Sequence, residues 1–405
     1  MQILVLNSGS SSIKYRLFDA DRGGDTPTLT ERATGTIERI GETASRTTSR
    51  IHRDGDVEEL VDEQRVTDHA DGFATLVATL EGAGVLTELV AIGHRVVHGG
   101  EEFVAPTVID ERVVERIRAQ IPLAPLHNPA NLTGIEVATA LRPDVPQVAV
   151  FDTAFHATLP TRAYRYAIDD EVAQTHGIRR YGFHGTSHAY VARRAADHLG
   201  RDDLGLVTLH LGNGASAAAI DAGHSIDTSM GLSPLEGLVM GSRSGDIDPA
   251  VIFHLVRQAG MGLDEVDELL NRRSGLLGLC GDNDLRVIEE RAEQGDQAAA
   301  SALEVYAYRI RKYVGAYAAA LGRLDAVVFT AGVGENSPTM RARVVEGLGL
   351  LGVSLAPDRN LAADVRTTPD GVVALHPDDA PVAVLAIATD EEREIATQSL
   401  TAIGA

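Results

Sequence analysis

The sequence predicts an α/β fold made of two similar domains, and three observations lead to this prediction. Segments with the periodicity of strands alternate along the chain with segments typical of amphipathic helices. A short hairpin pattern near the N-terminus recurs in the second half, which indicates a duplication. The length of 405 residues suits two to three domains of about 150 residues each.

The first predicted element is a hairpin with a polar tip. Residues 2–6 are apolar, residues 7–12 are rich in Gly and Ser, and residues 13–19 alternate between apolar and polar side chains. The polar stretches 21–30 and 42–56 predict surface loops or edge hairpins rather than linkers.

Two buried strands are predicted next, at residues 89–97 and 147–151. Polar or charged side chains lie at or just beyond their ends, namely Arg95, His98 and Asp152. Because open α/β sheets carry their chemistry at strand ends, these three side chains are candidates for a functional site. Helical periodicity predicts helices over residues 113–120, 129–141, 187–199, 249–257 and 298–321.

The hairpin pattern returns in the second half. Residues 206–211 form a strand, residues 212–216 a Gly-rich tip and residues 217–221 the returning strand. Two further strands are each predicted to lead into a helix. The strand at 326–330 runs into a Gly-rich loop at 331–337 and a helix after Pro338, and the strand at 382–388 ends at a helix N-terminus at 389–392.

The composition is that of a globular protein, with 44% hydrophobic and 23% charged residues, which excludes disordered, collagen-like and disulfide-scaffold classes. The single cysteine, Cys280, cannot form an internal disulfide and indicates a reducing compartment. The N-terminus lacks the features of a signal peptide, and no run of about 18 apolar residues occurs. We therefore expect a cytoplasmic protein without a membrane span.

The net charge of −22 comes from 36 basic and 58 acidic residues, and only two of the basic residues are lysines, Lys14 and Lys312. No basic run is present that could release counterions from a nucleic acid, so we expect no nucleic-acid partner. A site for anionic substrates would need local clusters of Arg and His.

Three Gly-rich segments follow predicted strands, at residues 7–12, 212–216 and 332–336. Exposed backbone N–H groups in such loops can bind phosphate oxygens, although any one of them could be an ordinary tight turn. The sequence has no P-loop motif, and no predicted strand leads into the dinucleotide-binding glycine pattern.

Histidine pairs four residues apart, His94 with His98 and His184 with His188, raise the question of zinc. The first pair lies in a strand, and neither pair has an obvious third ligand, so a zinc site is disfavoured. Arg243 lies in a Gly/Ser-rich loop that we expect to be flexible, and an arginine in such a loop is suited to binding an oxyanion. Arg95, which lies in a strand between apolar residues, is a second candidate for binding an oxyanion. The alternative for Arg95 and Arg243 is that both are solvated surface residues, and the alternative for Asp152 is that it only caps a turn.

Six motifs, in order along the chain, resemble those of the acetate kinase family. They are Asn7-Ser-Gly-Ser-Ser-Ser-Ile-Lys14, His94-Arg-Val-Val-His-Gly-Gly100, Tyr181-Gly-Phe-His-Gly-Thr-Ser-His188, His210-Leu-Gly-Asn-Gly214, Ser244-Gly-Asp-Ile-Asp-Pro249 and Gly332-Val-Gly-Glu-Asn336. The resemblance spans essentially the whole chain. It implies two duplicated actin-like, ribonuclease H-like domains flanking an ATP cleft, formed by residues 1–150 with 385–405 and by residues 151–384.

The resemblance also implies a function. Members of this family transfer a phosphoryl group from ATP to acetate, reversibly and with Mg²⁺ or its substitute Mn²⁺, to give ADP and acetyl phosphate on the route to acetyl-CoA. They are homodimers, so a homodimer is expected here.

Residue by residue, the resemblance implies that Asn7 and Glu391 hold magnesium and that Lys14 contacts the nucleotide phosphates. The other implied ATP contacts are His210, Leu211, Gly212, Asn213, Gly214, Asp284, Leu285, Arg286, Gly332, Val333, Gly334, Glu335 and Asn336. Two positions depart from the family pattern, because Asp390 stands where Asn is usual and Leu285 stands where Phe is common.

For the acyl substrate, the resemblance implies that Arg95 clamps the carboxylate. The resemblance also implies that Asp152 is catalytic and that His184 and Arg243 stabilise the transferring phosphoryl group. Because acetate is already ionised at neutral pH, we expect Asp152 to orient Arg95 or support the metal rather than act as a base.

The small acyl pocket implied by the resemblance is formed by Val97, Leu126, Phe183 and Pro234, with His127 beside it; plain core packing is the alternative. Two other functions are kept as alternatives. A propionate or butyrate kinase would need a roomier pocket. A non-catalytic actin-like ATPase module would keep the phosphate loops and dispense with Arg95, His184 and Arg243, all of which are present.

Overall fold

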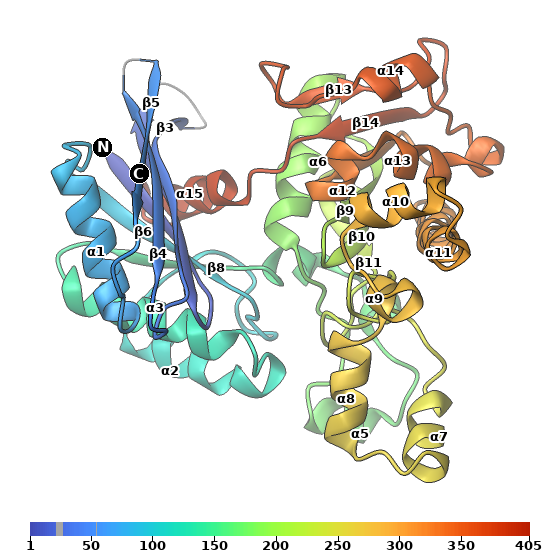
Figure 1. Ribbon diagram of the computed structural model, residues 1–405, viewed down its shortest axis with the longest axis horizontal. Coiled ribbons are helices and arrows are strands. Elements are labelled where there is room, and N and C mark those ends of the chain that lie inside the picture. Colours follow the sequence, from blue (N-terminus) through green and yellow to red (C-terminus); the bar gives the residue numbers. More distant parts are fainter. Residues whose placement is uncertain (22–26, 54) are drawn as a thin grey trace. The chain divides into compact units, whose positions relative to one another are not determined.

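The computed structural model describes residues 1–21, 27–53 and 55–405, and these form two compact units (Figure 1). The first unit comprises Met1–Phe155 and Asp390–Ala405, and the second comprises His156–Thr389. Residues 22–26 and 54, which belong to the polar stretches expected as loops or edge hairpins, lie outside the described residues.

The first unit is built on an eight-stranded sheet with the strand order β5-β4-β3-β2-β1-β6-β8-β7. The strands are β1 (Gln2–Ser8), β2 (Ser12–Asp21), β3 (Thr28–Glu38), β4 (Arg46–Arg53), β5 (Asp56–Asp62), β6 (Leu89–Val96), β7 (Thr107–Val108) and β8 (Gln147–Phe151). Strands β1 to β5 form an antiparallel meander, whereas β6 and β8 run parallel to β1. Strand β4 and the first residue of β5 lie within the polar stretch 42–56, so its edge-hairpin alternative is found there, whereas the rest of β5 lies beyond the predicted range.

Helices cover both faces of this sheet, which explains why its central strands are apolar along most of their length. The helices are α1 (His69–Gly82), α2 (Glu111–Ala119), α3 (Asn128–Leu141) and α15 (Glu391–Ala402). Along β1, Leu4 and Leu6 pack in the core with α1, while Ile3 and Val5 pack with Ile395 of α15 on the opposite face. The last helix of the chain thus completes the core of the first unit.

The second unit contains a six-stranded sheet with the order β11-β10-β9-β12-β14-β13. Its strands are β9 (Gly205–Leu211), β10 (Ala215–Asp221), β11 (His224–Thr228), β12 (Ala326–Thr330), β13 (Val372–Ala374) and β14 (Ala383–Ile387). The order and directions of β11-β10-β9-β12-β14 repeat those of β3-β2-β1-β6-β8. The predicted α/β fold with a duplicated hairpin is confirmed by this repeat in topology.

The helices of the second unit lie around its sheet, and the longest, α11, packs on β9, β10 and β11. They are α4 (Thr161–Tyr164), α5 (Asp170–Thr175), α6 (Gly185–Leu199), α7 (Ala250–Gln258), α8 (Leu263–Arg272), α9 (Gly275–Cys280), α10 (Leu285–Glu293), α11 (Gln297–Leu321), α12 (Ala331–Asn336), α13 (Pro338–Val345) and α14 (Pro357–Ala362). None of the helices in the described residues is long and apolar enough to cross a membrane.

Two of the predicted loops were wrong. Asn7 belongs to β1, where it pairs with Lys14 of β2, so the polar tip of the first hairpin is shorter than expected. The segment after β12 is not a loop but the short helix α12, which begins at Ala331 with φ at 62°. The carboxylate of Glu335 accepts a hydrogen bond from the Ala331 N–H at 2.8 Å, which closes this turn despite its glycines.

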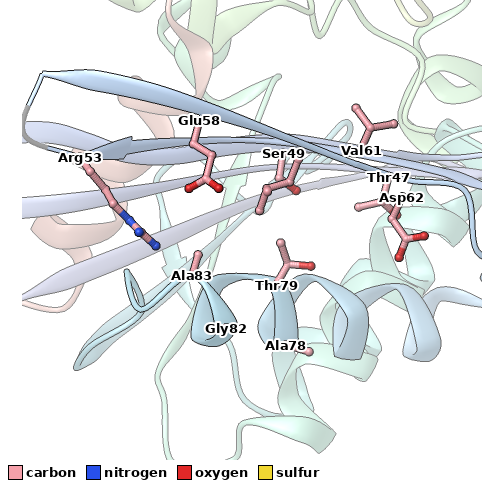
Figure 2. A pocket seen from close by; sticks show the side chains of 11 residues that line it. Thr47, Ser49, Arg53, Glu58, Val61, Asp62, Ala78, Thr79, Gly82 and Ala83 are labelled. Atoms are coloured by element: carbon pink, nitrogen blue, oxygen red, sulfur yellow. The ribbon is translucent and has the colours of Figure 1, made fainter.

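A cavity of about 480 Å³ lies between β4, β5 and helix α1 of the first unit (Figure 2). In Figure 2, Ser49 and Glu58 on the strands face Thr79 on the helix and Ala83 directly after its end. None of the predicted site residues lines this cavity.

Candidate active site

In the first unit, three predicted site residues lie at the carboxyl ends of neighbouring parallel strands. Asn7 is near the end of β1, Arg95 near the end of β6, and Asp152 directly follows β8. The Leu6–His94 and Val96–Phe151 register pairs align these strand ends. The location predicted for Arg95 and Asp152, at the ends of strands, is therefore found.

Arg95 and Asp152 form a bidentate ion pair. The guanidinium Nε and Nη2 donate to the carboxylate at 3.0 and 2.6 Å, and Asp152 is only 1% exposed. Glu391 lies on the other side, with Oε2 3.8 Å from Arg95 Nη2. Burial alone would lower the pKa of Arg95, but Asp152 and Glu391 raise it above its ordinary value, so the guanidinium stays charged.

The N-terminus of α15 is held by a cluster of arginines. Asp390 caps the helix by accepting from the Arg393 N–H at 3.0 Å, and it also pairs with the Arg393 and Arg16 side chains. Arg16 pairs in addition with Glu31. These pairs balance the extra charge that this chain carries at Asp390, and they place Glu391 at the first position of the helix.

The donor set of Asn7 and Glu391 suits Mg²⁺, a hard cation that binds oxygen and needs few protein ligands because waters and phosphate oxygens complete its octahedron. Both residues lie at the end of the sheet that carries Arg95. No group of three or more His, Cys, Asp or Glu residues that could hold a metal occurs in residues 1–21, 27–53 and 55–405.

The remaining predicted residues of the first unit are more exposed. Lys14 is exposed on β2, and Leu126 is 60% exposed. Val97 is half-buried, with its N–H donating to Asn131 Oδ1 at 3.1 Å, and His127 immediately precedes α3.

In the second unit, four predicted residues converge near the tip of the β9–β10 hairpin. A methyl group added at Gly214 would lie 3.5 Å from both Arg243 Nη1 and His184 Nε2. The rings of His184 and His210 stack with their centroids 4.2 Å apart. Two cationic or proton-donating side chains thus face the Gly-rich tip, as an anion site requires.

Arg243 has no ion pair with any described residue, and burial lowers its pKa below the ordinary value. Its Nη1 donates to the carbonyl of Pro234 at 3.1 Å. The expectation of a flexible loop is wrong, because backbone N–H groups of Gly241 and Ser244 donate to Asn213 and Leu270. The guanidinium is therefore held in place on a fixed backbone.

His184 occupies an unusual backbone position. It has φ at 56° and precedes helix α6, in the left-handed region that non-glycine residues rarely adopt. Phe183, before it, is buried at 2% exposure, and its carbonyl is hydrogen-bonded to His156 Nε2 at 3.1 Å. This strained turn directs the His184 ring towards Gly214.

A cavity of about 790 Å³ in the second unit brings together three of the predicted nucleotide segments. Its lining includes Gly212, Asn213, Asp284, Leu285, Arg286, Gly332, Val333 and Asn336 from those segments. Leu285 is almost fully buried and supplies apolar surface where Phe is the more common residue. The cavity combines apolar walls with a few polar groups, which suits a nucleoside.

Other predicted residues do not line this cavity. Glu335 turns inward, where its carboxylate accepts from the backbone of Ala331 and Thr389 at 2.8 and 3.0 Å. Burial raises its pKa above the ordinary value. It holds the backbone of α12 in place, and Gly334 is buried beneath it.

Sequence reasoning missed several residues at this cavity. Its lining also includes Gly241, Leu276, Asn283, Glu289, Tyr306, Ser337 and Arg366. Arg341, 1% exposed, was missed as well, although its Nη1 donates to the carbonyls of Gly334 and Glu335 and its Nε to Asn360 Oδ1. Asn283 and Ser337 directly adjoin predicted nucleotide segments in the sequence. The others are brought to these segments only by the fold.

Comparison with known proteins agrees with this arrangement. The sequence model of the acetokinase family matches residues 2–397. An acetate kinase of Streptomyces griseus subsp. griseus is 56% identical and aligns over 100% of this chain and 96% of its own length. The crystal structure of Porphyromonas gingivalis acetate kinase has a TM-score of 0.91 at 40% identity, covering 99% of both chains. A propionate kinase from Francisella tularensis has a TM-score of 0.90, also at 40% identity, covering 98% of both chains. The chain belongs to the acetokinase family.

Proposed function

We propose that this chain transfers the γ-phosphoryl group of ATP to acetate, reversibly and with Mg²⁺, by direct in-line displacement. Acetate kinase activity follows from its family and from relatives 56% identical over its whole length. The observation that carries the residue-level proposal is the convergence of Arg243 and His184 on the Gly-rich tip at Gly214. A non-catalytic ATPase module would have no use for these groups.

The nucleoside of ATP would occupy the 790 Å³ cavity of the second unit. Leu285 and Leu276 offer apolar surface to a base, and Asp284 and Asn336 offer polar atoms to a ribose. The phosphates would extend towards Gly212–Gly214, whose backbone N–H groups suit phosphate oxygens. Lys14 of the first unit is proposed as a further phosphate contact.

Arg243 and His184 are proposed to stabilise the phosphoryl group during transfer. Negative charge then spreads over three equatorial oxygens, and cations or N–H donors held in place lower its energy. Arg243 pays little reorganisation energy because its guanidinium is already half-buried and held by the Pro234 carbonyl.

Arg95 is proposed to bind the acetate carboxylate. Its Nε and Nη2 are engaged by Asp152, and among the described residues none accepts a hydrogen bond from Nη1. Asp152 then serves as a positioning residue for Arg95, since a carboxylate nucleophile needs no base. Val97, Leu126, His127, Phe183 and Pro234 are proposed as contacts of the methyl group.

Asn7 and Glu391 are proposed to hold Mg²⁺, directly or through water. When bound, the ion neutralises phosphate charge. The chain's own contribution is to fix Glu391 at the start of α15 through the Arg16–Asp390 pair, and to balance its charge against Arg95.

The second candidate function is that of a propionate kinase. The observation that favours it is the similarity to the Francisella tularensis propionate kinase, at 40% identity and a TM-score of 0.90. A pocket distinguishes acids that differ by one methylene by only about 1 to 3 kcal/mol. We would measure acyl phosphate, trapped as hydroxamate, with MgATP and acetate, propionate or butyrate. If kcat/KM is highest with acetate, the result supports acetate kinase. If kcat/KM is highest with propionate or butyrate, the protein is better described as a kinase of that acid. ATP consumption without acyl phosphate contradicts both functions.

We also propose that the two units are the two domains expected from the duplication, that the protein works in the cytoplasm, where ATP is available, and that it forms a homodimer. Sedimentation at micromolar concentration tests the last point, since a mass near twice 42.9 kDa is expected.

A further inference from the structure

Behind His184 runs a line of buried hydrogen-bonded side chains to which the proposed reaction assigns no role. His184 Nδ1 lies 2.9 Å from Ser216 Oγ, which lies 2.8 Å from His188 Nε2. His188 Nδ1 lies 2.8 Å from Thr208 Oγ1. Ser216, His188 and Thr208 are all 0% exposed. The line therefore runs from the ring that faces Gly214 into the core of the second unit.

The proton count of this line is constrained. Burial lowers the pKa of His188 well below its ordinary value, and the neighbouring His156 and His210 lower it further, so this ring is neutral and carries one N–H. Ser216 has one hydroxyl proton and can donate to only one of its two histidines. The proton position on each ring thus fixes the position on the next.

We propose that Thr208, His188 and Ser216 are positioning residues that keep a proton on His184 Nε2, where it donates to the transferring phosphoryl group. In this arrangement Thr208 donates to His188 Nδ1, His188 Nε2 donates to Ser216, and Ser216 donates to His184 Nδ1. The neutral His184 ring must then carry its proton on Nε2, the nitrogen that lies nearest a methyl group built at Gly214. This inference rests on the proposed role of His184.

The same line also accommodates a protonated His184. If the Ser216 and Thr208 hydroxyls rotate and the His188 proton moves to Nδ1, Ser216 accepts from His184 Nδ1–H and donates to His188 Nε2. Every buried nitrogen of the two rings keeps a partner in both arrangements, which avoids the cost of an unpaired buried polar atom. In both, His184 presents an N–H at Nε2.

Two neighbouring side chains bear on the charge of His184. They are the stacked His210, whose Nδ1 is hydrogen-bonded to Ser187 Oγ at 2.7 Å, and the Arg243 guanidinium near Gly214. His156 lies edge-on to His188, with ring centroids 5.7 Å apart. Arg243 opposes a second positive charge on His184 until an anion lies between them.

The variant that tests the line is Ser216→Ala, and the chain offers a matched control in Ser225→Ala. Ser225 is also 0% exposed and also hydrogen-bonds to a buried histidine, His156, at 2.8 Å, but it does not belong to the line. Ser216→Ala removes two buried serine–histidine hydrogen bonds and Ser225→Ala removes one, so a merely structural effect should appear in both variants. His188→Gln, whose amide can still donate to Ser216, serves as a conservative variant.

We expect Ser216→Ala to lower kcat about 10- to 100-fold, with KM for ATP and acetate changed less than threefold. Ser225→Ala should keep kcat within about threefold although its Tm also falls, and His188→Gln should retain more activity than His188→Ala. Equal kcat in Ser216→Ala and Ser225→Ala overturns the proposal.

A second readout does not depend on turnover. Histidine-selective ¹⁵N labelling reports which ring nitrogen carries the proton, and resonance assignment uses the loss of one signal in His184→Gln. We expect the Nε2–H form of His184 in the unliganded wild type and a mixture of both forms in Ser216→Ala. An unchanged His184 signal in Ser216→Ala overturns the proposal. If the wild type makes no acyl phosphate but these shifts appear, the proposed function fails while the proton line stands.

Discussion

Asp152 accepts hydrogen bonds from Nε and Nη2 of Arg95, at 3.0 and 2.6 Å, from a position almost without solvent contact. A buried carboxylate with a bidentate arginine partner fixes the plane of the guanidinium as well as its charge. The neighbouring strands β6 and β8, aligned by the Val96–Phe151 pair, bring the two side chains together. The pair gives a direct way to separate positioning from proton transfer.

Asp152→Asn should raise the acetate KM at least tenfold and lower Tm by several degrees, because the amide accepts one bond of the two and leaves the Arg95 charge less compensated. Steady-state kinetics between pH 5 and 9, with thermal unfolding alongside, measure both effects. If Asp152 were instead a base, the variant would keep its acetate KM and lose the acidic limb of the pH profile of kcat.

Arg95→Ala should chiefly weaken acetate binding and leave ATP binding near normal, since the guanidinium contacts the carboxylate and not the nucleotide. We expect the acetate KM to rise 100-fold or so, about 3 kcal/mol. Arg95→Lys keeps the charge without the bidentate geometry, so its acetate KM should lie between those of the wild type and Arg95→Ala. Lost ATP affinity with unchanged acetate KM would contradict the assignment.

Arg243→Ala should lower kcat about 10³-fold and change the acetate KM far less, because the contact strengthens as charge develops on the phosphoryl oxygens. Its backbone is held by Gly241 and Ser244, so the loop should keep its shape in the variant. Tm and the ATP dissociation constant serve as controls. An effect confined to KM would contradict the role of Arg243 in stabilising the transferring phosphoryl group.

Arg341→Met should lower the stability of the protein by about 3 kcal/mol or more, because four buried acceptors, among them the carbonyls of Gly334 and Glu335, lose their donor. Burial lowers the pKa of Arg341 to about 10, so the side chain remains charged at neutral pH. Since those carbonyls belong to α12, we also expect a raised KM for ATP. Urea unfolding and ATP titration measure the two effects, and a stable variant with weak ATP binding would contradict the structural role.

Stability should fall as the pH is lowered from about 6.5 towards 4. Burial lowers the pKa of His94 and of His156 to about 4, whereas an unfolded histidine titrates near 6.5. Between these values the unfolded chain binds protons that the folded chain does not, so each histidine costs about 1.4 kcal/mol of stability per pH unit. In the same pH range, His94→Gln should reduce the slope of the unfolding free energy against pH by about 1.4 kcal/mol per pH unit, the contribution of one proton. An unchanged slope would contradict the prediction.

Much of the site could be predicted because its residues follow strands. Arg95 and Asp152 lie where the apolar runs of two predicted buried strands end, and Gly212–Gly214 interrupts a hairpin whose two strands are both apolar. The motifs also located the nucleotide segments that line the 790 Å³ cavity. The long helices were found to within about two residues, since their apolar faces repeat over many turns.

The rest had no local signal. Strand β5 is exposed along most of its length and shows no apolar alternation, so only pairing with β4 reveals it. Helix α12 is rich in glycine and depends on Glu335, whose other partner, Thr389, is distant in sequence. Ser216 lies in a Gly-rich segment and His188 in a histidine pair, but their alignment behind His184 exists only once β10 and α6 have packed.

The first unit is assembled from both ends of the chain, because Ile395 and Leu400 of α15 pack on the face of β1 that carries Ile3 and Val5. A protein emerging from the ribosome therefore completes its second unit before its first. Until α15 has been synthesised, one face of the sheet of the first unit lacks its cover and Glu391 is not yet in place. Nascent chains should thus acquire nucleotide affinity before they acquire the complete residue set for catalysis, and the exposed sheet face is where a chaperone would be needed.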